Sequence, residues 1–328
     1  MFLKTAFIVL IAAASKTRAN AQTMSVPTHD STEIAFASDT QAPMWVETIL
    51  LKYNRNRTAT RMLFSDVARR KPQALFILGD VVNLGYSSLQ WKPMDRYLQH
   101  LRDTGIAVHG ILGNHEVMGR PRKGQRKFQQ RFPDHVPTGY VKVVDSVAVV
   151  LLNSNFNTLT REDNELQQTW YEQTMKELDA DPNVQFTIVS CHHSPFTNSR
   201  IVPANKTVQE RFVPAYLKAK KAKLFLSGHS HNYEHFRRGG KDFLVIGGGG
   251  GLHQPLRPGA DEMNDEAHDY KPMFHYLTVK REEGHLVVLS HQLEGDFSTF
   301  GSGRSLSIKK ESEQVLDVAP ARLVTKSD

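Results

Sequence analysis

Short apolar runs recur along this chain, and each ends in polar side chains. The first three runs are residues 34–37, 74–78 and 106–112, and polar clusters containing Asp39, Asp80 and Asn114 follow them. Between the runs, residues 42–70, split near Tyr53, and residues 89–104 repeat apolar side chains at helical spacing. Strands that alternate with helices predict an α/β fold, in which the carboxyl ends of parallel strands meet at one edge of a sheet. We therefore expect the three polar clusters to lie close together.

The second half of the chain continues this pattern. The apolar run 184–190 leads into Cys191-His192-His193, and the run 224–226 leads into Ser227-Gly228-His229-Ser230-His231. In a continuing strand His229 and His231 would point to opposite faces, whereas in a loop their rings can diverge toward two neighbouring ions. The run 243–246 leads into five glycines, for which we expect a flexible loop at the edge of a cleft. Two hairpins are also predicted, over residues 140–152 and 274–293.

The two ends of the chain differ from its centre. Lys4, the apolar run 6–14 and the small residues Ala19-Asn20-Ala21 predict a secretory signal peptide over residues 1–21, with a secreted or periplasmic product. The run is too short to span a bilayer, so we expect no stable membrane insertion after its removal. A folded domain is expected over residues 30–297. Residues 298–328, in which recurring apolar positions fade, are expected to form a flexible tail.

The net charge gives no support to nucleic-acid binding, and the cysteine content gives none to a disulfide-stabilised fold. Removal of the three cations in residues 1–21, with no acid among them, lowers the formal charge from +7 to +4. This surplus is too small to indicate a nucleic-acid-binding protein. Cys191 is the single cysteine, so the chain makes no intramolecular disulfide, and we expect a small buried side chain there.

The polar residues after the apolar runs are of the types that bind metal ions. Carboxylate, amide oxygen and imidazole together suit Mn²⁺, Fe²⁺, Zn²⁺ or Mg²⁺, and the lack of thiolates argues against a structural zinc site. Seven donors exceed the need of one ion but suit two ions that share a carboxylate, for which Asp80 is the natural bridge. The candidate ligands are Asp39, Gln41, Asp80, Asn114, His192, His229 and His231.

These motifs, in this order, resemble those of the calcineurin-like metallophosphoesterase superfamily. The blocks are Asp-x-Gln, Gly-Asp, Gly-Asn-His-Glu, His-His and Gly-His-x-His, between residues 39 and 231. The resemblance implies a four-layer αββα sandwich of two mixed β-sheets flanked by helices. It places Asp39, Gln41, Asp80 and His231 on one ion, and Asp80, Asn114, His192 and His229 on the other. It also implies that His115 is the catalytic histidine, which acts on the phosphoryl group or leaving oxygen, with Glu116 as a supporting partner.

The sequence departs from the family pattern at two positions. Most members have histidine where Gln41 stands, and this change favours Mn²⁺ or Mg²⁺ over zinc, with Mn²⁺ preferred. Purple acid phosphatases have a ligating tyrosine three residues after the bridging aspartate, where this chain has Asn83. We therefore do not expect a ferric-tyrosinate site.

The resulting hypothesis is an exported hydrolase with two metal ions and a small phosphorylated substrate, either a phosphate ester or a nucleotide-like anhydride. Two ions would convert a shared water to hydroxide and neutralise the phosphoryl oxygens. One alternative is a phosphodiesterase or nuclease, and another is an exported phosphate-ligand-binding protein without turnover. The six cations of residues 120–131 form either a solvated face or a rim that attracts an anionic substrate.

Overall fold

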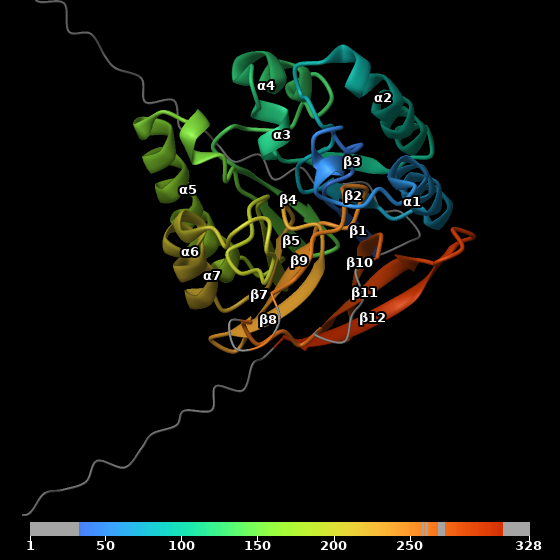
Figure 1. The fold of residues 1–328 in the computed structure, drawn as a ribbon. Helices are drawn as coiled ribbons and strands as arrows, with labels where there is room; N and C mark the ends of the chain where they lie inside the picture. The colour runs from blue at the N-terminus through green and yellow to red at the C-terminus, as the bar shows by residue number, and fades with distance from the viewer. Residues whose placement is uncertain (1–32, 258, 260–261, 268–272, 311–328) are drawn as a thin grey trace, which may run out of the picture.

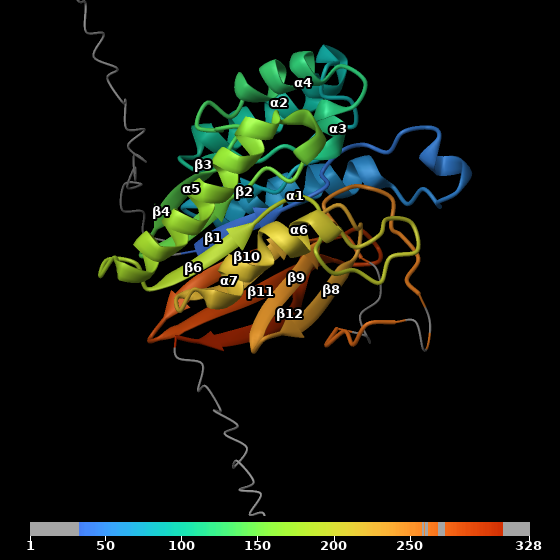
Figure 2. The same ribbon diagram turned by 90° about the vertical axis from the view of Figure 1, so that its left-hand side faces the viewer.

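The computed structural model describes residues 33–257, 259, 262–267 and 273–310. The predicted signal peptide and the end of the predicted tail, from residue 311, lie outside this part of the chain. Two six-stranded sheets lie face to face, with helices on both outer sides (Figures 1 and 2). The predicted four-layer αββα sandwich of two mixed sheets is confirmed.

The first sheet combines three parallel strands with three antiparallel ones. Strands β1, β2 and β3 are parallel neighbours, and β10, β11 and β12 continue the sheet from β1 in antiparallel pairs. In sheet order the strands are β12 (Phe300–Lys309), β11 (His285–Leu293), β10 (His275–Glu282), β1 (Glu33–Ala37), β2 (Ala74–Ile77) and β3 (Ala107–Gly110).

The second sheet has a parallel centre and two antiparallel edges. Strands β5, β6, β7 and β9 run parallel, while β4 and β8 form hairpins with β5 and β9. In sheet order the strands are β4 (Tyr140–Val144), β5 (Val147–Leu151), β6 (Phe186–Ser190), β7 (Ala222–Ser227), β9 (Lys241–Ile246) and β8 (Tyr233–Arg238).

Helices form the two outer layers and short helical segments connect them. A helix was expected from residue 42 to the split near Tyr53, but within this range the chain forms only the 3-10 turn η1 (Glu47–Ile49). The other helical elements are α1 (Asn56–Arg70), α2 (Ser88–Asp103), α3 (Asn114–Val117), α4 (Pro121–Gln129), η2 (Phe156–Thr158), α5 (Arg161–Ala180), α6 (Lys206–Arg211) and α7 (Val213–Lys218). Among the described residues no helix combines the length and the apolar character needed to cross a membrane.

Alternating side chains of the strands supply three cores, one between each pair of layers. On β1, Ala35 and Ala37 pack toward α1 and α2, whereas Ile34 and Phe36 pack between the two sheets. On β5, Val150 joins a third core, which includes residues of α5 and α7. This alternation follows from the two-residue period of a strand that is buried on both faces.

The predicted flexible tail is wrong at its start, because residues 300–309 form β12. This strand pairs with β11 along its length, from His285↔Lys309 to Leu293↔Phe300. Phe300 is buried in the outer core, and Leu306 and Ile308 pack against the core between the sheets. The folded domain therefore extends beyond residue 297, to at least Lys309.

Candidate metal centre

The polar clusters predicted at strand ends meet at one edge of the sandwich. Asp39 follows β1, Asp80 follows β2 and His192 follows β6, and one donor atom from each lies within 4.8 Å of the others. Donor atoms of His192, His193 and His229 form a second such group. The three members of the first group are almost fully buried. His192 belongs to both groups, so the two form one continuous cluster between the sheets.

Asp80 lies at the centre of this cluster. Its Oδ1 accepts the backbone N–H of His115 at 2.8 Å, and its Oδ2 lies 3.2 Å from Nε2 of His192. The same ring nitrogen is 3.0 Å from Oδ1 of Asn114. Burial opposes ionisation of this carboxyl, but the charges of His192 and His115 hold the pKa of Asp80 well below its usual range. Asp80 is thus a charged and oriented carboxylate.

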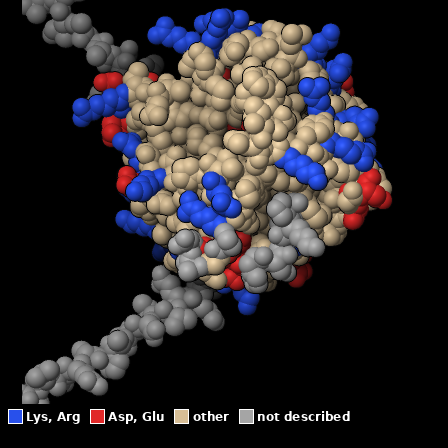
Figure 3. Space-filling view, in the orientation of Figure 1, with Lys and Arg blue, Asp and Glu red and all other residues tan. Residues whose placement is uncertain are grey.

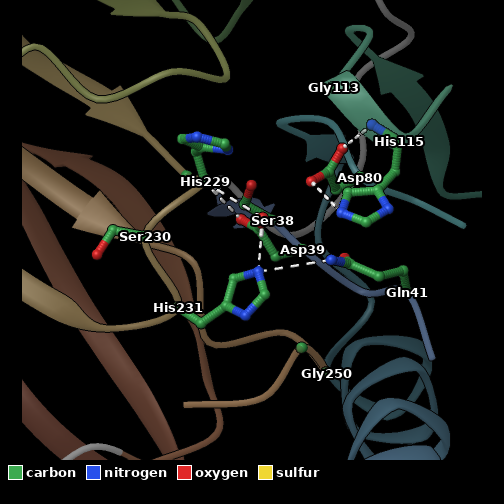
Figure 4. A network of polar contacts seen from close by, with 12 residues as sticks. Ser38, Asp39, Gln41, Asp80, Gly113, His115, His229, Ser230, His231 and Gly250 are labelled. Atoms are coloured by element: carbon green, nitrogen blue, oxygen red, sulfur yellow. Dashed lines mark hydrogen bonds and ion pairs between the residues drawn. The ribbon is translucent and has the colours of Figure 1, made fainter. Parts of the chain in front are cut away.

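Asp39 organises the other half of the cluster (Figure 4). Its carboxylate accepts the backbone N–H of His229 at 3.0 Å, and its Oδ1 lies 3.4 Å from Nε2 of His231. Ser230 points away from the carboxylates. The Gln41 amide is best satisfied when its nitrogen donates to the backbone oxygen of Asp80, at 2.7 Å. The amide oxygen of Gln41 then faces the ring of His231, as an oxygen ligand would.

Hydrogen bonds to the backbone orient three of the histidine rings. Nδ1 of His192 lies 2.9 Å from the carbonyl oxygen of Leu78, and Nδ1 of His231 lies 2.7 Å from that of Leu252. A neutral ring that donates from Nδ1 has its lone pair at Nε2, which in both residues faces a carboxylate. His115 is held in the same way, with Nδ1 3.0 Å from the carbonyl oxygen of Asn83.

The electrostatics of the cluster favour a cation between its donors. Burial lowers the pKa of His192, but the charge of Asp80 outweighs burial and raises it to about 9. Without another cation, a proton is therefore held between the imidazole and the carboxylate. Burial and the neighbouring rings of His193 and His192 hold the pKa of His229 well below its usual range, so that ring is neutral. The donor set fits divalent metal ions, whose binding would displace the proton from His192.

Three of these residues adopt a strained backbone conformation. Asp39, Asp80 and His229 have φ angles of 57°, 50° and 66°, in the left-handed region that non-glycine residues rarely enter. Such strain costs on the order of 1–3 kcal/mol per residue and persists only where the surroundings enforce it. One enforcing contact is the buried carboxylate of Glu116, which accepts the backbone N–H groups of Asp80 and Gly113 at 2.8 Å each.

Two glycines allow the loops to approach the carboxylates. A Cβ atom at Gly113 would collide with the Asp80 carboxylate, and one at Gly228 would collide with Ser38 and Asp39.

The five-glycine run was predicted to be a flexible cleft-edge loop, and this prediction is wrong. Residues 247–251 are buried, and the Asn56 amide donates to the carbonyl oxygens of the last two at 2.8 Å.

The structure adds residues that the sequence did not single out for the site. The His193 ring lies 4.6 Å from that of His229, centroid to centroid, and its Nδ1 is 2.8 Å from Oγ of Ser154. The His-His doublet was the available signal, but it did not distinguish a site residue from a structural one. Glu47, Leu51 and other side chains line a pocket of about 190 Å³ that also contains Asp80, Asn114, His115, His229 and His231. No sequence motif marked this wall.

A family model described as calcineurin-like phosphoesterase matches residues 32–233, and the chain belongs to this family. Among solved structures, the purple acid phosphatase PPD1 from yellow lupin (Lupinus luteus) is similar with 13% identity and a TM-score of 0.65. The match covers 84% of this chain and 53% of that one, so this chain spans about half the length of the lupin enzyme.

Two further solved structures share the fold over most of both chains. GAP50, described as the anchor in the inner membrane complex of Plasmodium, has 12% identity and a TM-score of 0.63, with 86% of this chain and 90% of that one covered. A dimetal phosphatase from Danio rerio has 14% identity and a TM-score of 0.54, with 85% and 99% covered. No curated protein sequence matches this chain significantly. At these identities the structural likeness establishes the fold alone.

Proposed function

We propose that this chain is an exported metal-dependent hydrolase of small phosphorylated substrates, either esters or nucleotide-like anhydrides. The observation that supports this most is the convergence of Asp39, Asp80 and His192 from three separate strands, within 4.8 Å of one another and almost fully buried. Burying two carboxylates together is costly unless cations compensate their charge. Membership of the calcineurin-like phosphoesterase family is consistent with that compensation coming from metal.

Asp80 would be shared by two divalent ions, with Mn²⁺ preferred and Fe²⁺, Mg²⁺ or Zn²⁺ as the other options. One ion would be held by Asp39, Gln41, Asp80 and His231, and the other by Asp80, Asn114, His192 and His229. When bound, such ions lower the pKa of a water, so that hydroxide is available to attack phosphorus, and they supply positive charge for the phosphoryl oxygens. The amide of Gln41, with its oxygen toward His231, is compatible with this assignment.

His115 is the residue we assign to the leaving group. The Asn83 carbonyl oxygen fixes its Nδ1, and its Nε2 lies 3.8 Å from Oδ2 of Asp80, at the wall of the pocket. Burial lowers the pKa of His115, but the Asp80 charge and the Asn83 carbonyl outweigh burial and raise it above its usual value. A raised pKa favours the protonated ring, which suits a general acid that would donate from Nε2 to the departing oxygen.

The proposal is tested by hydrolysis of p-nitrophenyl phosphate and bis-p-nitrophenyl phosphate, each with Mn²⁺, Fe²⁺, Mg²⁺ or Zn²⁺ added to chelator-treated protein. We expect metal-dependent turnover that Asp80→Asn abolishes, because the shared carboxylate loses its charge. Metal binding without turnover of these or of natural phosphate esters would contradict the proposal. It would favour an exported phosphate-ligand-binding protein without turnover. Salt-sensitive cleavage of DNA would instead indicate a nuclease.

A further inference from the structure

A short segment between β1 and α1 presents apolar side chains to solvent beside the metal centre. The described residues contain nine exposed large hydrophobic side chains, and five of them fall within residues 45–53. Such a concentration exceeds the scattered exposure that is normal for a protein surface and indicates an interaction site. We call these five residues the apolar lip: Trp45, Val46, Ile49, Leu50 and Tyr53.

The apolar lip is held by a defined turn. The backbone N–H of Leu50 donates to the carbonyl oxygen of Glu47 at 3.1 Å, and the Glu47 carboxylate accepts the N–H of Met44 at 2.6 Å. Glu47 also lines the pocket of the metal centre, whereas Trp45 and Ile49 are 76% and 70% exposed. The segment protrudes from the body of the molecule in Figure 2, where it is drawn in blue. The turn therefore directs apolar side chains outward at the entrance to the site.

Four exposed cations lie near the lip. Lys52, Arg55 and Arg57 follow it and are exposed, and Arg200 is exposed beside the apolar Ile201, which lines the same pocket. The view in Figure 3 shows this face of the molecule with a broad uncharged centre, and with Lys and Arg as well as some Asp and Glu around it. An apolar protrusion with cations around it matches the surface of an anionic bilayer: aromatic and aliphatic side chains enter the headgroup region, and the cations attract lipid phosphates.

We propose that the apolar lip binds an anionic phospholipid bilayer and places the pocket against the membrane surface. The lip is a protrusion, which a fluid interface accommodates, whereas a protein partner would need a matching cavity. A consequence that rests on the proposed function is that the preferred substrates are phosphate esters anchored at that surface. Membrane binding itself is independent of hydrolysis, and the two are tested separately.

The test is co-sedimentation of chelator-treated protein with vesicles of phosphatidylcholine, either alone or mixed with phosphatidylglycerol. We expect binding to the mixed vesicles that added salt weakens. The double substitution Trp45→Ser and Ile49→Ser is expected to weaken binding by about tenfold or more, because both side chains would leave water on binding. Leu166→Ser is the matched control, since Leu166 is 57% exposed on α5, outside the lip, and its loss is expected to leave binding unchanged.

Tryptophan fluorescence gives an independent readout. Insertion of Trp45 into lipid shifts its emission to shorter wavelength, and Trp45→Phe is expected to remove the shift. Of the other two tryptophans, Trp91 is fully buried, and Trp170 lies on α5, outside the lip, packed against the third core. Thermal unfolding of each variant shows whether it is folded. Three outcomes would overturn the proposal. In the first, the wild-type protein does not bind vesicles, and in the second, the Leu166→Ser variant loses as much binding as the double variant. In the third outcome, the double substitution abolishes self-association of the protein and leaves vesicle binding unchanged. Failure of all hydrolysis assays would overturn the proposed function, but it would not affect the conclusion that the lip binds membranes.

Discussion

Asp80 illustrates how a single side chain connects the two halves of the candidate centre. One of its oxygens is fixed by the backbone N–H of His115, and the other faces the rings of His192 and His115. Its own backbone is held in the left-handed region, with φ at 50°, and its N–H is bonded to Glu116. The residues around Asp80 thus determine both its charge and its direction before any ligand arrives, which is the preorganisation that catalysis on phosphate esters requires.

His115 provides the first prediction at this scale. Removing its ring in His115→Ala should lower kcat by about 10²–10⁴-fold, because the leaving oxygen loses its proton donor. The bound metal should remain unchanged, since His115 is not among the assigned ligands. Steady-state kinetics with an alkyl phosphate ester, whose leaving oxygen must gain a proton, and elemental analysis of the purified variants measure the two effects. The exposed His100→Ala serves as the control, and wild-type turnover in His115→Ala would refute the assigned role.

Glu116 provides the second prediction, which concerns the stability of the folded chain. Its two carboxylate oxygens accept the N–H groups of Asp80, Gly113 and Val82, the last at 3.1 Å. In Glu116→Gln the amide nitrogen would face one of these donors, leaving a buried N–H without an acceptor. We expect a loss of about 1–3 kcal/mol in the free energy of unfolding, measured by urea denaturation. A variant as stable as the wild type would show that Glu116 does not hold the loops in place.

At the scale of elements, hydrophobic periodicity predicted those that are buried on both faces. The runs that became β1 and β2 are continuously apolar and that of β6 is largely so, and the polar residues after them were correctly expected to meet. Strand β12 was missed because its glycines and serines have low strand propensity, and its apolar residues Phe300, Leu306 and Ile308 are few. Its formation depends on pairing with β11, a contact to a distant part of the chain that local sequence does not specify.

The remaining differences between prediction and structure have the same origin. The helix expected from residue 42 reduces to the turn η1, because its apolar side chains have no surface to pack against and remain exposed. The glycine run was expected to be flexible, yet Asn56 and the loop after β1 enclose it. The assignment of ligands to motifs came from family resemblance, while the left-handed φ angles and the Glu116 bonds required three dimensions.

Strand β12 leads to a prediction about chain ends. A chain that stops after residue 297 should lose about 3 kcal/mol or more of stability, since it gives up the buried Phe300 and the contacts of Leu306 and Ile308. It should also aggregate, because β11 would become an exposed edge strand. Thermal unfolding and light scattering measure these effects. A chain that ends after Lys310 retains β12 and is the control, and equal behaviour of the two would mean that β12 contributes little.

At the scale of the whole molecule, buried histidines connect stability to pH. Five buried histidines outside the assigned site have a pKa of about 4, and burial is the leading cause of the lowering. The charged forms of these five side chains are therefore disfavoured in the folded protein. They occur in the cores and beside the sheets rather than in one place, so the effect belongs to the fold as a unit. The five are His109, His135, His253, His275 and His291.

His135 allows this effect to be measured at one position. Its ring is buried against Phe128 and Tyr140, with centroid distances of 5.1 Å and 6.2 Å, and neither ring nitrogen has a hydrogen-bond partner within the described part of the chain. Burial lowers the pKa of His135 to about 4 from 6.5. Between these values the unfolded chain binds the proton and the folded chain does not. The stabilising effect of high pH is therefore lost as pH falls through this window.

The expected size follows from the two pKa values. Lowering the pH from 7.5 to 5 should cost about 2 kcal/mol of unfolding free energy through His135 alone. In His135→Phe, which keeps an aromatic ring in the same core, that share of the pH dependence should disappear. Urea denaturation of both proteins at the two pH values measures the difference, with the exposed His100→Asn as the control. If His135→Phe lost as much stability on acidification as the wild type, a neutral buried ring at this position would be ruled out as a source of acid sensitivity.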